Sequence, residues 1–244
     1  MQLTFRAIEK AFEIEEKTLY QWLNDRGMPA VKANGQYHFN SVEVLEWALK
    51  YKIPLTIGAL KLCEKNRPGQ DILTPALIRG GVHFGIKGVR REEIFGEVLN
   101  VLPLPGHIDR SYLKEMLISR EQSGTTGIGS GIAIPHVKHP VIFAGLDPVI
   151  GLFFLETPVD FAALDGERVH TLFVILSGSF KGHLSLLSKL AFCLQNESVK
   201  AALGRRTNPE DILATFKISE AKTVKTSSME KVLVGSCPVP FGEL

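Results

Sequence analysis

The chain has 244 residues, which is enough for one medium-sized domain or two small ones. Hydrophobic residues make up 45% and charged residues 22% of the sequence, a composition that excludes a disordered or fibrous protein. The 28 lysines and arginines nearly balance the 26 aspartates and glutamates, so the overall charge does not direct the chain to nucleic acid or to a membrane.

The cysteines and the apolar segments exclude further classes. Cys63, Cys193 and Cys237 are odd in number and widely spaced, which favours a reducing compartment over a disulfide framework and gives no zinc-binding pattern. The most apolar stretch, 141–159, is interrupted by charged residues and prolines and does not fit a membrane-spanning helix. The first residues lack the basic start and apolar core of a secretory signal. We therefore expect a cytoplasmic protein without a membrane span, and we predict no metal site and no cofactor.

The first 55 residues have the pattern of a small domain. Apolar stripes at helical spacing, from Phe5 to Phe12 and from Leu19 to Leu23, predict two helices joined by a turn of about four residues, the length found in a helix-turn-helix. Asn34-Gly35 lies between alternating residues and predicts a hairpin. A third apolar stripe follows Asn40 and Ser41, either of which can cap a helix. This order predicts a winged helix-turn-helix over residues 1–55.

This segment resembles the excisionase-like and MerR-like DNA-binding domains. The matching residues are Leu3-Thr4, Thr18-Leu19-Tyr20-Gln21-Trp22-Leu23, Gly27-Met28-Pro29-Ala30, Asn34-Gly35-Gln36-Tyr37-His38-Phe39 and Leu45-Glu46-Trp47. The resemblance implies DNA as a partner of residues 1–55, although His38 stands where the family usually carries arginine. Seven basic residues (Arg6, Lys10, Lys17, Arg26, Lys32, Lys50, Lys52) are balanced by seven acidic ones (Glu9, Glu13, Glu15, Glu16, Asp25, Glu43, Glu46). A neutral module contacts phosphates only if its charges segregate by face, so a protein-interaction or vestigial module is the alternative.

The rest of the chain mixes predicted helices and strands. Residues 56–73 form a linker around a polar, turn-rich stretch, 74–218 form a second domain, and 219–244 form a tail that we expect to be mobile. Strands are expected at 131–135, 149–155 and 169–176. Helices are expected at 91–101, after Asp109, at 183–194, and from Pro209 to about Phe216. Interleaved strands and helices predict an α/β layered domain.

The most informative stretch of the second domain is 120–136. Four glycines lie within the eight residues 124–131, so successive amide N–H groups can converge on an anion. The spacing fits neither a P-loop nor a dinucleotide fingerprint, and no nucleotide site is predicted. A short apolar run then leads through Pro135, which keeps the preceding residue extended, to His136.

The residue types around His136 suit phosphoryl transfer. A neutral imidazole is a competent covalent nucleophile near neutral pH. A phosphoryl group needs preorganised donors, and the candidates are the hydroxyls of Thr125 and Thr126, the loop amides at Gly127, Gly129 and Gly131, and the guanidinium of Arg120 at the end of the preceding helix. His183, which opens a predicted helix, is expected to stay neutral beside an anion-friendly helix end.

This region resembles the IIA domains of the bacterial phosphotransferase system, of the mannitol/fructose type and its nitrogen-regulatory branch. The resemblance lies in Arg120-Glu121, Thr126-Gly127-Ile128-Gly129-Ser130-Gly131-Ile132-Ala133-Ile134-Pro135-His136, Asp160-Phe161, Leu164-Asp165-Gly166 with Val169, and Gly182-His183-Leu184 with Leu187. It covers about residues 74–218 and implies a mixed sheet flanked by helices. It also implies that His136 is the phosphorylated histidine, with Arg120 and His183 as companions, and that the donor is an HPr/NPr-like phosphocarrier protein. Val137 differs from the family pattern, which has a small residue there.

Three functional hypotheses follow. The first is a phosphorelay protein that accepts a phosphoryl group on His136, in a regulatory role of the nitrogen type acting on target proteins, or as a sugar-specific component. The second is a transcription regulator in which residues 1–55 bind DNA and the second domain is a phosphorylation sensor. In the third, residues 1–55 dock a protein partner.

Overall fold

The computed structural model describes residues 2–33, 35–51, 53–54, 56, 72–137 and 147–234. Asn34, nearly all of the predicted linker and the last ten residues of the predicted tail lie outside the described residues, as do Cys63 and Cys237. The described residues form two modules, which we call the first module (residues 2–50) and the second module (residues 72–234).

The first module combines three helices with a small antiparallel sheet. Its elements are β1 (Gln2–Thr4), α1 (Phe5–Phe12), α2 (Glu16–Asp25), β2 (Val31–Ala33), β3 (Gln36–Asn40) and α3 (Ser41–Lys50). β3 is the middle strand, between β1 and β2. The Thr4 hydroxyl accepts a hydrogen bond from the Ala7 N–H and caps α1. The three helices and the two hairpin strands expected from the sequence are therefore present, while their identification as a winged helix-turn-helix stays a prediction.

Aromatic packing holds the first module together. Ile8, Leu19 and Phe39 are fully buried, and the rings of Trp22 and Trp47 lie 5.1 Å apart between centroids. The Trp47 indole N–H donates to the backbone carbonyl of residue 26 at 2.9 Å, which ties α3 to the end of α2. α3 is thus fixed by its inner face, and its opposite face is available to the second module.

The second module is built on a five-stranded mixed sheet. Its elements are α5 (Leu73–Gly80), β4 (Val82–Ile86), α6 (Arg91–Val101), α7 (Arg110–Gln122), β5 (Gly127–Gly129), β6 (Ile132–Ala133), β7 (Val149–Val159), β8 (Val169–Leu176), α8 (Phe180–Leu194), α9 (Glu197–Arg205) and α10 (Pro209–Val234). The strand order is β4-β7-β8-β6-β5. β4 runs parallel to β7 and β6 parallel to β8, while the β7–β8 and β5–β6 pairs are antiparallel.

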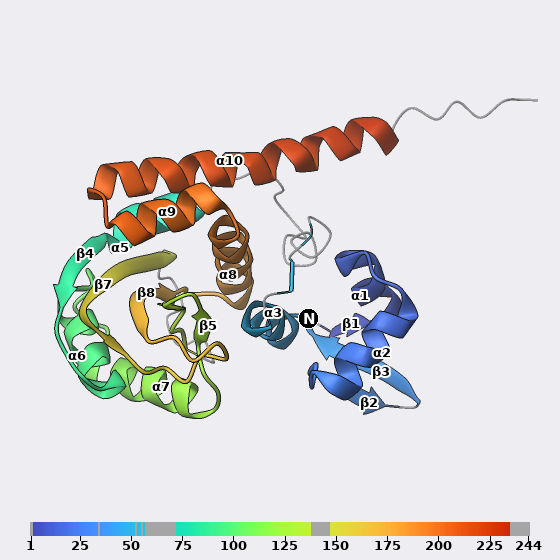
Figure 1. The fold of residues 1–244 in the computed structure, drawn as a ribbon, viewed down its shortest axis with the longest axis horizontal. Coiled ribbons are helices and arrows are strands. Elements are labelled where there is room, and N and C mark those ends of the chain that lie inside the picture. The colour runs from blue at the N-terminus through green and yellow to red at the C-terminus, as the bar shows by residue number, and fades with distance from the viewer. Residues whose placement is uncertain are drawn as a thin grey trace, which may run out of the picture.

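Helices cover both faces of this sheet (Figure 1). β7 and β8 are buried on both sides. The side chains of their nearly uninterrupted apolar sequences therefore pack into two separate cores, one on each face of the sheet. One core lies under α6 and α7, and the other lies under α5, α8, α9 and α10. The predicted mixed sheet flanked by helices is confirmed.

Several element ends differ from the sequence-based expectation. β6 is shorter than the strand predicted at 131–135 because 131 belongs to a tight turn and 134–135 leave the ladder. α8 begins at Phe180, before His183, because the Ser179 hydroxyl accepts from the Gly182 N–H and caps the helix there. α10 does not end near Phe216 but continues to Val234.

A mobile tail was predicted from residue 219 onward, but Glu220 lies within α10 and is only 1% exposed. Its carboxylate accepts hydrogen bonds from the N–H groups of Ile72 and Leu73 at 2.9 and 2.8 Å, and from the N–H and hydroxyl of Thr74 at 2.9 and 2.8 Å. The Lys189 ammonium lies 3.7 Å away. A carboxylate from α10 therefore caps the start of α5, which no local sequence pattern could reveal.

Replacement of Glu220 by alanine is expected to destabilise the protein by about 3–5 kcal/mol, because it leaves the first amides of α5 and the Lys189 charge buried without this carboxylate. Urea unfolding measures the loss. The control is Lys217→Ala on the exposed side of the same helix, expected to change stability by less than about 0.5 kcal/mol. Equal stabilities of the two variants would contradict the capping role.

Among the described residues, no helix is both long and apolar enough to cross a membrane.

Candidate functional site

His136 lies where the chain continues past β6 alongside β8. The residue forms a parallel bridge with Ile175, and the Ile175 N–H donates to the Pro135 carbonyl at 3.1 Å. The imidazole Nδ1 lies 2.8 Å from the carbonyl oxygen of Ile134. A carbonyl only accepts, so Nδ1 carries the proton and the ring orientation is fixed. This leaves Nε2 to face the site at the carboxyl end of two parallel strands, where α/β sheets commonly bind ligands.

Arg120 reaches this nitrogen from the last turn of α7. Its Nε is 3.3 Å from His136 Nε2, and one terminal nitrogen donates to the Gly124 carbonyl at 2.9 Å. The other terminal nitrogen is 2.6 Å from an oxygen of Glu46. The guanidinium side chain is only 10% exposed and is held from three directions. The structure therefore brings Arg120 and His136 together, 16 positions apart in the chain.

His183 is the second imidazole of the site. Its ring centroid lies 5.0 Å from that of His136, and it is only 2% exposed. Its Nδ1 is buried and makes no hydrogen bond within the described part of the chain. Burial, reinforced electrostatically by the neighbouring His136 and Arg120 and opposed by Glu46, lowers the pKa of His183 to about 3. The ring is neutral, as expected, but because it is desolvated rather than because it opens a helix.

Glu46 is a site residue that the sequence analysis missed. It lies on α3 of the first module, with one carboxylate oxygen 2.7 Å from His136 Nε2 and the other 2.6 Å from Arg120. Ninety positions separate Glu46 from His136. The sequence marks Glu46 only as part of a resemblance to DNA-binding domains, and no spacing rule could have placed it here.

The charges around Glu46 stabilise its ionised form. Burial alone would raise the pKa of this carboxyl, but the hydrogen bond with His136 and the electrostatic effect of His136 and Arg120 outweigh burial and lower the pKa overall. An ionised carboxylate only accepts hydrogen bonds, so its contact with His136 is a hydrogen bond when Nε2 carries a proton. Nε2 otherwise accepts from the Arg120 Nε–H.

The exposure of His136 differs from what a docking histidine requires. The residue is only 3% exposed, because α3 covers the pocket beside it with Glu46, Leu49 and Lys50. Val137 does not face a partner either: it is 1% exposed and belongs to the core under α6 and α7. The covering helix comes from the other module, which the sequence could not show.

The glycine-rich segment is a tight hairpin of β5 and β6. The turn is made by Ser130 (φ +55°) and Gly131 (φ +68°). Gly131 packs so closely on His170 that an added Cβ would lie 2.2 Å from its Nε2. Gly129 and Gly131 are not among the residues that line the pocket beside His136. Their role in this arrangement is the turn itself.

Thr125, Thr126 and Gly127 do line the pocket beside His136. Their polar groups are engaged within the fold, however. The Thr125 hydroxyl donates to the Phe161 carbonyl, and the Gly127 N–H donates to that hydroxyl at 2.9 Å. In this arrangement the guanidinium of Arg120 is the donor that faces Nε2, and the phosphate-binding role of the threonines and loop amides stays a prediction.

A second missed residue, Glu121, organises this segment. It is 4% exposed, and its carboxylate accepts from the N–H of Thr126 at 3.1 and 3.2 Å and from the Thr126 hydroxyl. Arg91 lies 3.7 Å away. Glu121 thus fixes the chain between Arg120 and β5. Its adjacency to Arg120 was visible in sequence, but its inward direction was not.

Stability is expected to fall as the pH drops below about 6.5, because unfolded His183 takes up a proton that the buried ring does not. The folded pKa lies below the unfolded one, so this loss amounts to at most about 1.4 kcal/mol per pH unit between the two values. Urea unfolding from about pH 7.5 to about pH 5 measures it. His183→Gln should remove this part of the pH dependence, and the exposed His107→Gln should keep it. Identical profiles for wild type and His183→Gln would contradict the assignment.

Comparisons with known proteins concern the second module. Residues 79–218, more than half of the chain, match the family model described as "Phosphoenolpyruvate-dependent sugar phosphotransferase system, EIIA 2". The nitrogen regulatory protein of Pseudomonas aeruginosa is 37% identical over 136 residues, which cover 55% of this chain and 84% of that protein. The nitrogen regulatory protein of Escherichia coli K12 is 33% identical over 145 residues, or 58% and 85%.

Two further comparisons bear on length and fold. The fructose-specific EIIABC component of Bacillus subtilis is 33% identical over 134 residues, which are 54% of this chain but only 21% of that protein. The crystal structure of the nitrogen regulatory protein IIA-Ntr of Neisseria meningitidis has a TM-score of 0.52 and 27% identity, covering 60% of this chain and 99% of that one. The similarity therefore reaches the fold and the sequence of the second module.

Proposed function

The chain belongs to the EIIA type 2 family of the phosphoenolpyruvate-dependent sugar phosphotransferase system, and we propose that it is a cytoplasmic phosphorelay protein whose His136 accepts the phosphoryl group. The observation that carries the proposal is the fixed imidazole: Nδ1 is held by the Ile134 carbonyl, and Nε2 faces the guanidinium of Arg120. A nucleophile with a positioned cation beside it is what phosphoryl transfer requires.

The donor that fits this chemistry is a phosphohistidine on an HPr/NPr-like phosphocarrier protein. The reaction exchanges one P–N bond for another: the electron pair of the breaking bond returns to the donor nitrogen, and the lone pair of His136 Nε2 forms the new bond. Arg120 binds the phosphoryl oxygens, and neutral His183 adds no positive charge beside the attacking nitrogen. Nδ1 keeps its proton and donates it to the Ile134 carbonyl throughout.

A regulatory role acting on target proteins is proposed ahead of sugar transport. The relatives named nitrogen regulatory proteins are covered over most of their own length. The fructose-specific relative from Bacillus subtilis is covered over a fifth of its length, so a sugar-specific role is the alternative.

The test is phosphoryl transfer from a phosphorylated HPr-type carrier to the full chain. Wild type should acquire an acid-labile, alkali-stable label, and His136→Ala should lose it completely because no nucleophile remains. The matched control is His107→Gln, an exposed histidine that does not line the pocket beside His136, which should label like wild type. Equal labelling of His136→Ala and wild type would overturn the proposal.

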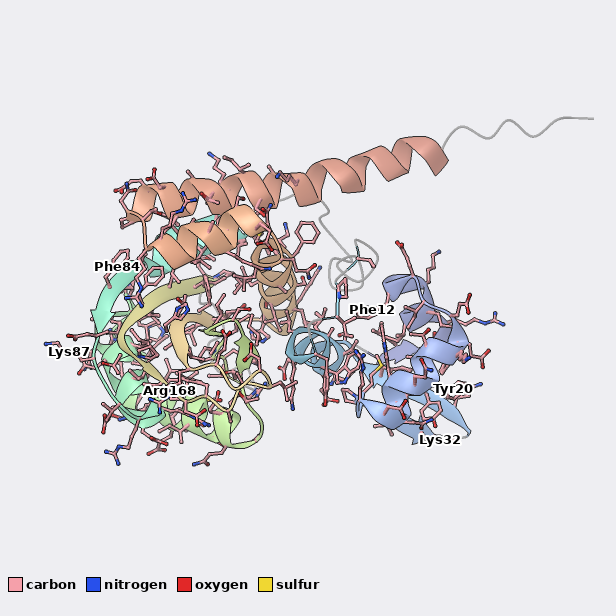
Figure 2. The ribbon with its side chains drawn as sticks, in the orientation of Figure 1. Phe12, Tyr20, Lys32, Phe84, Lys87 and Arg168 are labelled. Carbon is pink, nitrogen blue, oxygen red and sulfur yellow. The ribbon has the colours of Figure 1, made fainter. Side chains whose placement is uncertain are left out.

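DNA is proposed as a second partner because of the way the first module is docked. α3 faces the second module, and Figure 2 shows Tyr20 and Lys32, from α2 and β2, on the side of the first module that faces away from it. Both residues are exposed, as is Lys17 on α2. The helix and hairpin that a winged helix-turn-helix uses on DNA are therefore uncovered.

Fluorescence anisotropy with random duplex fragments tests this proposal. Wild type should bind with an affinity that falls steeply with salt, and Lys32→Glu should weaken binding about tenfold by adding a repulsive charge. Lys87→Glu, at the far end of the second module in Figure 2, is the control and should bind like wild type. An absence of binding at low salt, with or without phosphorylation, would rule DNA out.

A further inference from the structure

The two modules meet at the phosphoryl-accepting site itself. α3 packs against α8 and β5 of the second module, as Figure 1 shows, and Glu46 projects from α3 to His136 and Arg120. Glu46 is the acidic residue of this helix that is partly buried; Glu43, one turn earlier, is exposed. The position of Glu46 on the helix therefore places its carboxylate at Nε2 of His136, the nitrogen that the proposed reaction uses.

The carboxylate of Glu46 occupies the positions that a phosphoryl group on His136 needs. One of its oxygens lies 2.7 Å from Nε2, in the place of the phosphorus or its oxygens, and the other lies 2.6 Å from Arg120, in the place of a phosphoryl oxygen. A phosphoryl group is larger than a proton and carries negative charge, so it cannot share these contacts with an ionised carboxylate. When Nε2 donates this hydrogen bond it carries a proton, so its lone pair is not available to attack the donor.

We propose that the first module is a reversible cap on the phosphoryl site, with Glu46 as the internal ligand that takes the place of the phosphoryl group. Docking of α3 and phosphorylation of His136 then exclude one another. This inference rests on the proposed function of His136 and adds a partner for that site, namely the chain's own first module.

The construction of the contact allows the cap to separate. Its polar centre is the carboxylate with Arg120 and His136, and its apolar part includes Leu184 and Ala191 of α8, which join the core of the first module. Beside it lies a pocket of about 240 Å³ lined by residues of both modules, including Ala48, Ile128 and Ala191. This pocket is open to solvent, so the apolar packing between the two modules is not continuous there.

The coupling has a defined direction. A phosphoryl group on Nε2 places negative charge against Glu46 and removes the hydrogen bond that held it, so α3 is released. By thermodynamic linkage, anything that binds the released first module favours phosphorylation of His136 to the same extent. The phosphorylation state of His136 thereby determines whether the first module is docked on the second module or released from it.

The decisive measurement is the rate of phosphoryl transfer from a phosphorylated HPr-type carrier to full-length variants. Glu46→Ala removes the internal ligand and should label at least about tenfold faster than wild type, within the range typical of coupled sites. Glu46→Gln keeps the shape without the charge and should label at an intermediate rate. Glu43→Ala, the same change one turn earlier on the exposed face, should label at the wild-type rate.

A second measurement follows the release directly. Small-angle X-ray scattering of wild type should show a larger radius of gyration after phosphorylation, and Glu46→Ala should be expanded already before it. Amide hydrogen exchange on the contact face of α8, around Leu184 and Ala191, should rise in the same samples.

The outcomes distinguish a failure of the proposed cap from a failure of the proposed phosphoryl acceptance by His136. If Glu46→Ala is labelled on His136 at the wild-type rate or more slowly, or if phosphorylation leaves the radius of gyration unchanged, the cap is wrong while phosphoryl acceptance stands. If neither wild type nor Glu46→Ala is labelled, the proposed function fails and the cap falls with it.

Discussion

The hydrogen bond from His136 Nδ1 to the Ile134 carbonyl is the contact on which the site depends. Because the acceptor is a backbone group only two residues away, the ring is held by the strand that carries it. Nε2 therefore faces the other groups of the site. Arg120 from α7 and Glu46 from α3 contact this nitrogen, and the ring of His183 from α8 lies beside the His136 ring. Three helices from two modules thus converge on one nitrogen.

The charged groups at this nitrogen compensate one another in a poorly hydrated place. A guanidinium and a carboxylate satisfy each other at 2.6 Å, and a second imidazole is kept neutral by burial. Such a site favours an anion at the position that Glu46 occupies. The first module supplies an anion from within the chain, and in the proposed function a phosphoryl group on His136 competes with it for the same preorganised cation. In this proposal, docking of the first module and phosphorylation of His136 each place a negatively charged group beside Arg120.

Local patterns predicted those elements whose ends are set by nearby residues. The helix at 91–101 was predicted with its observed bounds, and Asp109 caps α7 as expected, because apolar periodicity and a capping side chain act within one turn. The predicted end of α10 was too early, because the continuation of this helix is stabilised by the contact of Glu220 with α5, 146 to 148 positions away. In the glycine-rich segment the Gly127 N–H donates to Thr125 and the Ser130 N–H to Asp165, contacts that local glycine spacing does not reveal.

Periodicity and capping in the sequence indicated two modules with helices and strands, and the resemblance to the phosphotransferase IIA domains implied the mixed sheet and the trio of His136, Arg120 and His183. What lies against that trio depends on the folded chain. Glu46 belongs to a different module, and a contact across 90 positions leaves no trace in local spacing. The direction of α3 relative to the sheet is set by packing between surfaces, and packing is a property of the folded chain rather than of any segment.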